Sequence, residues 1–220
     1  MNQRDGMEKE HYPYSVSLDL KGMPCLVVGG GGVALRKIQS LLSSGANVTV
    51  VSPEVVPEIE TFKGIDIIRR EFQPEDLDGK FLVISATNNR PVNESVAGEA
   101  RQRNMLVNVV DVPDLCNFFV NSQVRRGDLA ISISTSGASP ALAKRIRKEL
   151  EEQYGDEYSR LLSLMREYRP VIIGKVPDPE RRKAIFERID AEHLETIVRE
   201  QGEEVAREKI EAIIRESAPE

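Results

Sequence analysis

Four consecutive glycines carry the clearest chemical signal, in the stretch CLVVGGGGVALRK (25–37). They separate an apolar run from an amphipathic segment, so they lie where a buried strand would meet a helix. Gly29, Gly31 and Ala34 fill the three small positions of the pattern G-x-G-x-x-G/A. In that pattern the first position allows a tight turn, the second lets a pyrophosphate approach the backbone, and the third lets the helix pack on the strand. The stretch therefore predicts a dinucleotide site, and a purely structural turn is the alternative.

A carboxylate is the second candidate for chemistry. Asp111 ends the apolar run LVNVVD (106–111), which would place it at the carboxyl edge of a parallel sheet, where α/β folds bind ligands. An Asp with an ordinary pKa of about 3.9 is ionised at neutral pH and can accept a proton. Asn108 and Asn117 bracket Asp111, could hold it by hydrogen bonds, and are assigned to the substrate-binding site. A turn-forming Asp before Val-Pro is the alternative interpretation.

A loop of small polar residues, STSGASP (134–140), is the third candidate. It precedes a basic helical segment, and hydroxyl groups beside basic side chains suit an anion. The residues assigned to this anion site are Ser134, Thr135, Ser136, Gly137 and Lys144. In the alternative interpretation Ser139 is a helix N-cap, Pro140 is the first helical residue, and the basic side chains are solvated.

The residues after the second apolar run bear on which dinucleotide fits. A dinucleotide fold often places Asp or Glu there to bind the ribose hydroxyls, whereas this chain has Ser52, Pro53 and Glu54. Glu54 could reach a ribose from the first turn of a short helix opened by Pro53, or could simply be solvated. Because no Lys or Arg follows directly to hold a 2′-phosphate, the sequence favours NAD over NADP.

Alternating strands and helices must position these residues. Strands rich in Val, Ile and Leu are expected at 25–29, 48–52, 65–69, 81–86 and 106–111, with helices at 34–44 and 91–104. This alternation predicts an α/β fold with a Rossmann-like, doubly wound parallel sheet. Apolar segments at 117–124 and 129–135 flank RRGD and predict an antiparallel pair. A charged helical tail follows, with a break at 169–179.

The same order of elements divides the chain into three parts. They are a nucleotide-binding domain (1–112), a small β segment (113–145) and a helical C-terminal domain (146–220). Apolar residues alternate along the β segment, but a two-stranded segment has too little chain to bury them alone. We therefore expect the segment to dimerise.

Composition argues against several classes of function. Residues 1–150 carry 18 basic and 18 acidic side chains and residues 151–220 carry 12 and 18, so the net charge of −6 lies in the tail. No concentrated basic surface for nucleic acid is expected. No apolar run approaches the roughly 20 residues of a membrane span, and no signal-peptide pattern opens the chain.

Cysteine and histidine usage indicates a reducing cytoplasm and no metal site. The two cysteines are Cys25, in an apolar run where a buried thiol is expected, and Cys116, so no disulfide is expected. The two histidines, His11 and His193, lie in the polar start and the acidic tail. Neither forms a ligand cluster with the cysteines.

Four blocks of sequence together indicate a family. In order they are VVGGGGVALRKI, SATNNRPVN, NVVDVPDLCNFFVNS and ISTSGASPALAKRIRKEL. Over about residues 12–155 the chain resembles the precorrin-2 dehydrogenase family, which includes the dehydrogenase and ferrochelatase module of siroheme synthase. The resemblance implies oxidation of precorrin-2 to sirohydrochlorin with NAD, insertion of ferrous iron in many members, and an intertwined homodimer. A methyltransferase domain is not expected after residue 155.

The resemblance also implies roles for single residues, beginning with Asp111 as the family's catalytic aspartate. The positions that correspond to its NAD contacts are Gly29, Gly31, Gly32, Val33, Pro53, Glu54, Ser85, Ala86 and Thr87. Some members have Asp at position 32, and a serine that some members phosphorylate corresponds to Thr135. The substrate has many carboxylates, which suit the basic residues near 125–126 and 144–148; each of these is otherwise a surface charge.

The chemistry implied by the family needs one general base. A hydride and a proton must both leave the macrocycle, and Asp111 can take the proton. The same carboxylate could remove pyrrole protons during iron insertion, with the ring ligating the metal. Two other interpretations stay open: a regulatory module that senses NAD without catalysis, and a dehydrogenase without chelatase activity.

Overall fold

The first half of the chain folds into a parallel β-sheet. The computed structural model describes residues 13–217, so His11 lies outside the described residues. The strands are β1 (Pro24–Val28), β2 (Asn47–Val51), β3 (Ile65–Ile68), β4 (Leu82–Ser85) and β5 (Leu106–Val109). They pair in parallel in the order β3-β2-β1-β4-β5. The predicted parallel sheet is confirmed.

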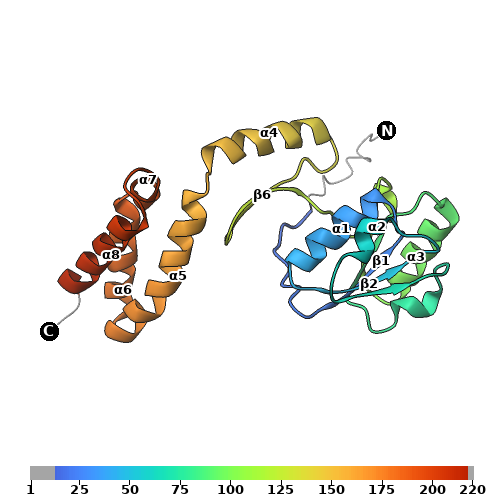
Figure 1. Ribbon diagram of the computed structural model, residues 1–220, viewed down its shortest axis with the longest axis horizontal. Coiled ribbons are helices and arrows are strands. Elements are labelled where there is room, and N and C mark those ends of the chain that lie inside the picture. The colour runs from blue at the N-terminus through green and yellow to red at the C-terminus, as the bar shows by residue number, and fades with distance from the viewer. Residues whose placement is uncertain (1–12, 218–220) are drawn as a thin grey trace, which may run out of the picture. The chain divides into compact units, whose positions relative to one another are not determined.

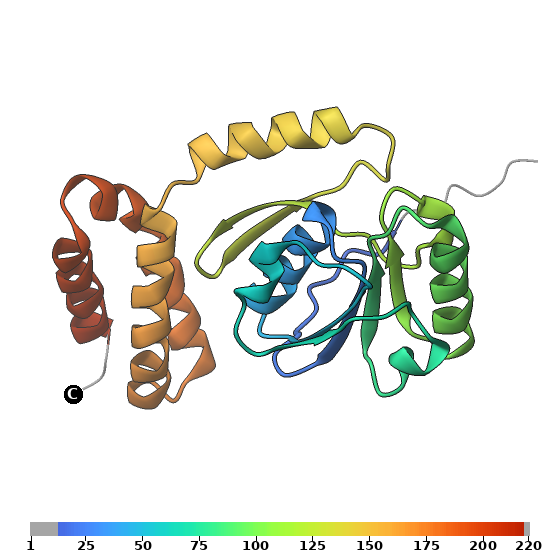
Figure 2. The ribbon, with the colours of Figure 1, turned by 45° about the vertical axis from the view of Figure 1, so that its right-hand side comes forward.

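Helices cover both faces of this sheet, as Figures 1 and 2 show. The elements are α1 (Gly32–Ser43), α2 (Pro57–Glu60) and α3 (Arg90–Gln102), with 3₁₀ turns η1 (Pro74–Leu77) and η2 (Pro113–Leu115). Side chains alternate along each strand, so Cys25 and Val27 of β1 join a core with α1 and α2, while Leu26 and Val28 join a second core with α3 and η1. Burial on both faces explains the continuous apolar runs.

The strand order reverses beside β1, and this creates a ligand-binding edge of the sheet. β1 pairs with β2 on one side and with β4 on the other, with Val28 opposite Ser85. The chain leaves β1 toward α1 on one face and leaves β4 toward α3 on the other. Open α/β sheets bind ligands in the crevice at such a switch point. Gly29 and Ala86, the first residues after β1 and β4, both lie at this edge.

The chain divides into two compact units between Val120 and Asn121. The second unit contains an antiparallel pair and five helices: β6 (Ser122–Arg126), β7 (Leu129–Ile133), α4 (Pro140–Gln153), α5 (Glu157–Lys175), α6 (Pro179–Ala191), α7 (Leu194–Glu200) and α8 (Glu203–Ser217). Helices α5 to α8 share one core with Leu164, Ile185 and Ile210 at its centre. The three-part division at 112 and 145 remains a prediction. Within residues 13–217, no helix is long and apolar enough to cross a membrane.

Two predicted boundaries near the first unit are wrong. Pro53 does not open a helix: α2 begins at Pro57, and the Ser52 hydroxyl donates to the Glu54 carbonyl at 2.6 Å in a non-helical turn. The strand expected from residue 117 begins only at Ser122. Its first part instead follows the edge of β5, where the Asn117 N–H donates to the Val107 carbonyl at 3.0 Å.

The predicted break at 169–179 contains the observed one but begins too early, because only residues 176–178 separate α5 from α6. Helix α5 continues through Pro170 and ends at Lys175. Proline removes one backbone hydrogen bond and crowds the preceding turn. Tyr168 and Ile172 are buried in the core of α5 to α8 on either side of Pro170, so packing holds this part of the helix in place.

Candidate functional site

The four glycines of the loop between β1 and α1 have different surroundings. Gly29 has a φ of +116°, and a Cβ added there would collide with the Ala86 carbonyl. A Cβ on Gly30 would collide with the Glu54 carbonyl and the Val55 backbone, whereas Gly31 and Gly32 have no heavy atom near an added Cβ. The fold therefore requires the first two glycines. The open space at the other two is where a ligand can approach the backbone.

The helix that follows the loop offers backbone donors. Gly31 is the N-cap of α1, and neither a side-chain cap nor an acidic residue lies in the first turn. The Leu35 N–H bonds the Gly31 carbonyl at 3.0 Å, so the N–H groups at 32–34 precede the first intrahelical bond. Uncapped donors and the positive end of the helix dipole suit a pyrophosphate. This confirms the strand–glycine–helix geometry that the pattern predicts.

A groove of about 600 Å³ runs along this loop. Its lining includes Gly29 to Val33, the exposed Glu54 and the loop after β4. The volume lies in the range of cofactor sites, roughly 300–1,000 Å³. A smaller cavity of about 150 Å³ adjoins it at Gly29, Ser52 and Thr87 and is also lined by Pro53, Phe72 and Val92. The groove and the smaller cavity together suit an elongated dinucleotide.

Acidic side chains follow β2 and β3 beside the candidate cofactor site. Glu54, after β2, lines the groove, and Glu71, after β3, lines the smaller cavity. The neighbouring Arg70 donates to both carboxylate oxygens of Asp76, at 2.8 and 2.6 Å, and to the Glu71 carbonyl at 2.9 Å. The Asp76 side chain is 5% exposed, and the hydrogen bond from Arg70 lowers its pKa. The Arg70 guanidinium is therefore already bound to Asp76 and to the backbone of Glu71. The residues that line the smaller cavity include no Lys or Arg.

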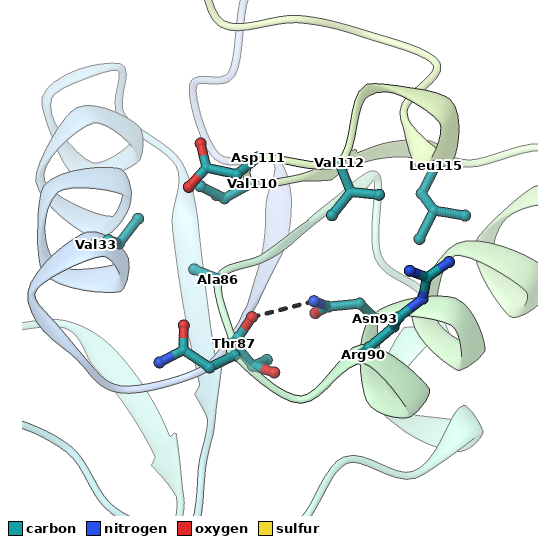
Figure 3. Close-up of a pocket in the computed structure, with 10 residues that line it drawn as sticks. Val33, Ala86, Thr87, Arg90, Asn93, Val110, Asp111, Val112 and Leu115 are labelled. Atoms are coloured by element: carbon teal, nitrogen blue, oxygen red, sulfur yellow. Dashed lines mark hydrogen bonds between the residues drawn. The ribbon is translucent and has the colours of Figure 1, made fainter.

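The loop after β4 is held in place by two hydrogen bonds through the buried side chain of Asn93. The Ser85 hydroxyl donates to Asn93 Oδ1 at 2.7 Å. Asn93 Nδ2 in turn donates to the Thr87 carbonyl at 3.1 Å, the bond drawn in Figure 3. Ala86 and Thr87 line the groove, as expected. Ser85 is fully buried, so its part in the site is to hold this loop.

Asp111 lines a separate cavity of about 270 Å³. This cavity shares Val33, Ala86, Thr87 and Asn88 with the groove. In Figure 3 the Asp111 carboxylate points toward the side of the cavity formed by α1. Asp111 has a φ of 62°, a left-handed conformation that is uncommon outside glycine and that clusters at functional sites. The structure thus brings the predicted base next to the predicted cofactor groove.

The prediction that Asn108 and Asn117 hold Asp111 is wrong. Asn108 Nδ2 donates to the Phe118 carbonyl at 3.0 Å. The Asn117 amide accepts from the Val107 N–H at 2.7 Å and donates to the Met105 carbonyl at 2.8 Å. Both side chains therefore join the segment after η2 to the free edge of β5. Among the described residues, neither bonds to the Asp111 carboxylate.

Sequence reasoning missed several residues of this site. Arg90 and Asn88 line the Asp111 cavity, and Figure 3 shows Arg90 on the opposite side of the cavity from Asp111. Lys37 lies one turn after Val33 on α1 and is half-buried. Burial and the nearby Arg36 lower its pKa, while the charge of Asp111 raises it. The block SATNNRPVN was the only sequence signal for Asn88 and Arg90; Lys37 became apparent only from the packing of α1.

The loop at 134–137 belongs to the second unit and caps α4. The Ser139 hydroxyl accepts from the Leu142 N–H at 3.3 Å, and Thr135 Oγ1 accepts from the Ser139 N–H at 3.2 Å. Ser136 and Gly137 have φ values of 50° and 82°. Lys144 is exposed on the first turns of α4. The N-cap interpretation is confirmed, and the anion site remains a prediction.

Comparisons with known proteins agree with this geometry. A family model described as "Putative NAD(P)-binding" matches residues 16–122, and one described as "Sirohaem biosynthesis protein central" matches residues 126–153. Proteins named siroheme synthase from Thioalkalivibrio sulfidiphilus and Methylobacillus flagellatus are 38% and 37% identical over 90% of this chain. The match covers 41% and 43% of those proteins, so the chain spans less than half their length.

A solved structure matches most of this chain. The structure named "SirC, precorrin-2 dehydrogenase" has a TM-score of 0.73 and 32% identity, and the match covers 93% of this chain and 100% of that chain. The parallel sheet, the glycine loop and the uncapped α1 define a Rossmann-type dinucleotide-binding protein. Within that class, the chain belongs to the precorrin-2 dehydrogenase family.

Proposed function

We propose that this chain is an NAD-dependent dehydrogenase that oxidises precorrin-2 to sirohydrochlorin in siroheme biosynthesis. The observation that carries the proposal is that the Asp111 cavity and the glycine-loop groove share Val33, Ala86 and Thr87. A dehydrogenation requires a hydride acceptor and a group that takes a proton, and a carboxylate beside a dinucleotide groove can be that group. The names of the relatives support the choice of substrate.

The residues present fit the dinucleotide. Gly31 and Gly32 leave room beside the backbone, and the first turn of α1 supplies donors for the pyrophosphate. Glu54 lines the groove and can accept from ribose hydroxyls. NAD, when bound, supplies the hydride acceptor. The acidic ends of β2 and β3 support NAD rather than NADP.

Asp111 takes the proton in this proposal. Precorrin-2 loses a hydride from a ring carbon and a proton from the macrocycle, so one carboxylate is sufficient as base. Val33, Val110 and Val112 line the cavity beside Asp111 and exclude water from part of it. Arg90, on the opposite side, can pair with a substrate carboxylate, and the loop at 134–137 with Lys144 remains assigned to the same task.

Ferrous iron insertion is a second proposed activity. The relatives named siroheme synthase support it, and removal of pyrrole protons again needs a base, for which Asp111 is available. Iron here is a substrate. Two alternatives remain: a dehydrogenase without chelatase activity, and a module that only senses NAD. The experiment below distinguishes both from the bifunctional enzyme.

A homodimer in the cytoplasm completes the proposal. Phe119, Val120 and Leu142 are 52%, 47% and 37% exposed, and β6 and β7 form an isolated two-stranded sheet, which is marginal on its own. A second copy would cover these apolar side chains. The free thiols of Cys25 and Cys116 support a reducing compartment.

Incubation with precorrin-2 and NAD tests the activity. We expect NADH to form together with sirohydrochlorin, and siroheme to form after ferrous iron is added. NADH without siroheme would indicate a dehydrogenase alone. NAD binding without NADH would indicate the sensing module and contradict the proposed dehydrogenase.

A further inference from the structure

The turn that carries Asp111 needs an external support. It is closed by the Val112 N–H, which donates to the Val109 carbonyl at 3.2 Å, and Asp111 occupies its third position. The left-handed backbone at Asp111, with φ of 62°, is unfavourable for residues other than glycine and persists only when the surroundings hold it. Asp111 itself is exposed, so few contacts of its own side chain can do so.

The Cys116 side chain contacts both ends of this turn. Its Sγ accepts from the Val109 N–H at 3.1 Å and from Asn108 Nδ2 at 3.6 Å. The thiol hydrogen has two acceptors within reach, the Val109 carbonyl at 3.2 Å and the Val112 carbonyl at 3.4 Å. One side chain therefore contacts the last residue of β5 and the residue after Asp111.

The position of β5 in the sheet explains why a side chain is needed there. β5 is the last strand of the order β3-β2-β1-β4-β5, so its outer edge has no strand partner in the described part of the chain. Asn117 bonds the backbone of Val107, and Cys116 bonds that of Val109. The segment after η2 thus takes the place of a sixth strand, mainly through side chains and with one backbone bond from Asn117. The contact of Cys116 with Val109 and Val112 lies at the turn of Asp111.

We propose that Cys116 is a positioning residue for Asp111: its thiol ties the two ends of the turn together and holds the carboxylate at the cofactor groove. The inference rests on the proposed function of Asp111 as base. Burial raises the pKa of the Cys116 thiol, so the thiol stays protonated and can donate to the carbonyls. Its role is therefore to hold the backbone, and it acts on the substrate only through Asp111.

Substitution of Cys116 tests the inference against a matched cysteine. Cys116→Ala removes every contact of the thiol, and Cys116→Ser keeps a donor and an acceptor in nearly the same place. Cys25→Ala is the control, because Cys25 is buried in β1 with one weak hydrogen bond, to the Met23 carbonyl at 3.5 Å. Thermal unfolding and NAD affinity are measured for all three.

We expect Cys116→Ala to lower kcat for precorrin-2 oxidation about 10- to 100-fold, as small misplacements of catalytic groups do, with unchanged NAD affinity. Cys116→Ser should recover most of the rate, and Cys25→Ala should keep the wild-type rate even if it melts earlier. Amide exchange at Val109 and Val112 should be faster in Cys116→Ala. If Cys116→Ala does not fold, Cys116→Val, which fills the space without hydrogen bonds, takes its place.

Wild-type kcat in a folded Cys116→Ala or Cys116→Val protein would overturn the inference, and so would equal losses in Cys25→Ala. An inactive wild-type protein would contradict the proposed function instead. In that case amide exchange decides the inference alone: unchanged protection at Val109 and Val112 in the Cys116 variant overturns it, and faster exchange supports it.

Discussion

At the scale of single residues, neighbouring residues of the same or similar type have different roles. Gly29 and Gly30 are required because backbone from β4 and from the turn after β2 lies against them, while Gly31 and Gly32 border open space. Similarly, Asp111 lines its cavity, whereas Asn117 bonds to backbone and Asn108 bonds to the Phe118 carbonyl and the Cys116 thiol. The role of each residue follows from what its atoms touch.

The two middle glycines allow a paired test of stability against binding. Gly30→Ala should lower the free energy of unfolding by about 1–3 kcal/mol, because the added methyl overlaps the Glu54 carbonyl. Gly31→Ala should leave stability nearly unchanged and weaken NAD binding, because its methyl would occupy the path of the pyrophosphate. Urea unfolding and calorimetric titration with NAD measure both. Equal NAD affinity in wild type and Gly31→Ala would mean that the pyrophosphate does not approach at this position.

The sequence predicted the residues whose pattern is local and missed those that depend on distant chain. Gly29, Gly31 and Ala34 follow from spacing alone, and Asp111 follows from its place after a strand. Gly30 is constrained by the carbonyl of Glu54, which spacing does not show. Asn117 looked like a substrate contact because its use at the edge of β5 depends on which strand lies last in the sheet.

At the scale of elements, the carboxyl ends of the strands decide what the sheet binds. The residues after β1 and β4 line the groove, Asp111 follows β5, Glu54 after β2 lines the groove, and Glu71 after β3 lines the smaller cavity. The order and direction of these strands follow from apolar runs separated by helices, so they were predictable. The engagement of Arg70 by Asp76 was not, because it depends on how η1 folds back on β3.

The acidic ends of β2 and β3 predict a preference for NAD. Wild type should bind NAD more tightly than NADP, because Glu71 repels a 2′-phosphate and the cavity lining offers no cation. Glu71→Lys should raise NADP affinity roughly tenfold, which is about 1.4 kcal/mol. Glu75→Lys is the control, since Glu75 is exposed on η1 and does not line the cavity. An unchanged ratio of the two affinities in Glu71→Lys would exclude Glu71 as the determinant.

The ion pair between Arg70 and Asp76 predicts a dependence of stability on pH. The hydrogen bond from Arg70 lowers the folded-state pKa of Asp76, so its contribution is full above the unfolded value of about 3.9 and is lost as pH falls through the folded value. Asp76→Asn should cost about 1–2 kcal/mol at pH 7, and this difference should shrink below pH 4.

Urea unfolding at pH 7 and at pH 3 measures the effect of Asp76. Asp78→Asn is the control, because the Asp78 side chain is 71% exposed and lies 3.7 Å from Arg103. A difference between wild type and Asp76→Asn that stays constant from pH 7 to pH 3 would show that the charge of Asp76 does not stabilise the fold.

At the scale of the whole molecule, each unit has its own core. The sheet of the first unit is packed between two apolar clusters, and α5 to α8 enclose another. In the β6–β7 pair Val124 is buried, but Leu129, Ile131 and Ile133 are only half-buried. The alternation of apolar residues in the sequence predicted this apolar face. The sequence of one chain does not show how a second copy would cover it.

The exposed apolar residues predict a homodimer. Light scattering at micromolar concentration should give twice the mass of the chain. Leu142→Glu, on α4, should shift the protein toward the monomer because it places a charge in the proposed interface. Ile173→Glu, the same kind of exchange at a 45% exposed position on α5, is the control. A wild-type monomer would contradict the prediction.

The central claim is that Asp111 is the base beside the cofactor groove, and Asp111→Asn tests it most directly. Asn has nearly the same size and shape but cannot accept a proton as a carboxylate does. With precorrin-2 and NAD, the variant should keep its fold and its NAD affinity and lose about 10²- to 10⁴-fold in the rate of NADH formation. If Asp111→Asn oxidises precorrin-2 at nearly the wild-type rate, the base is another group and Asp111 only shapes its turn.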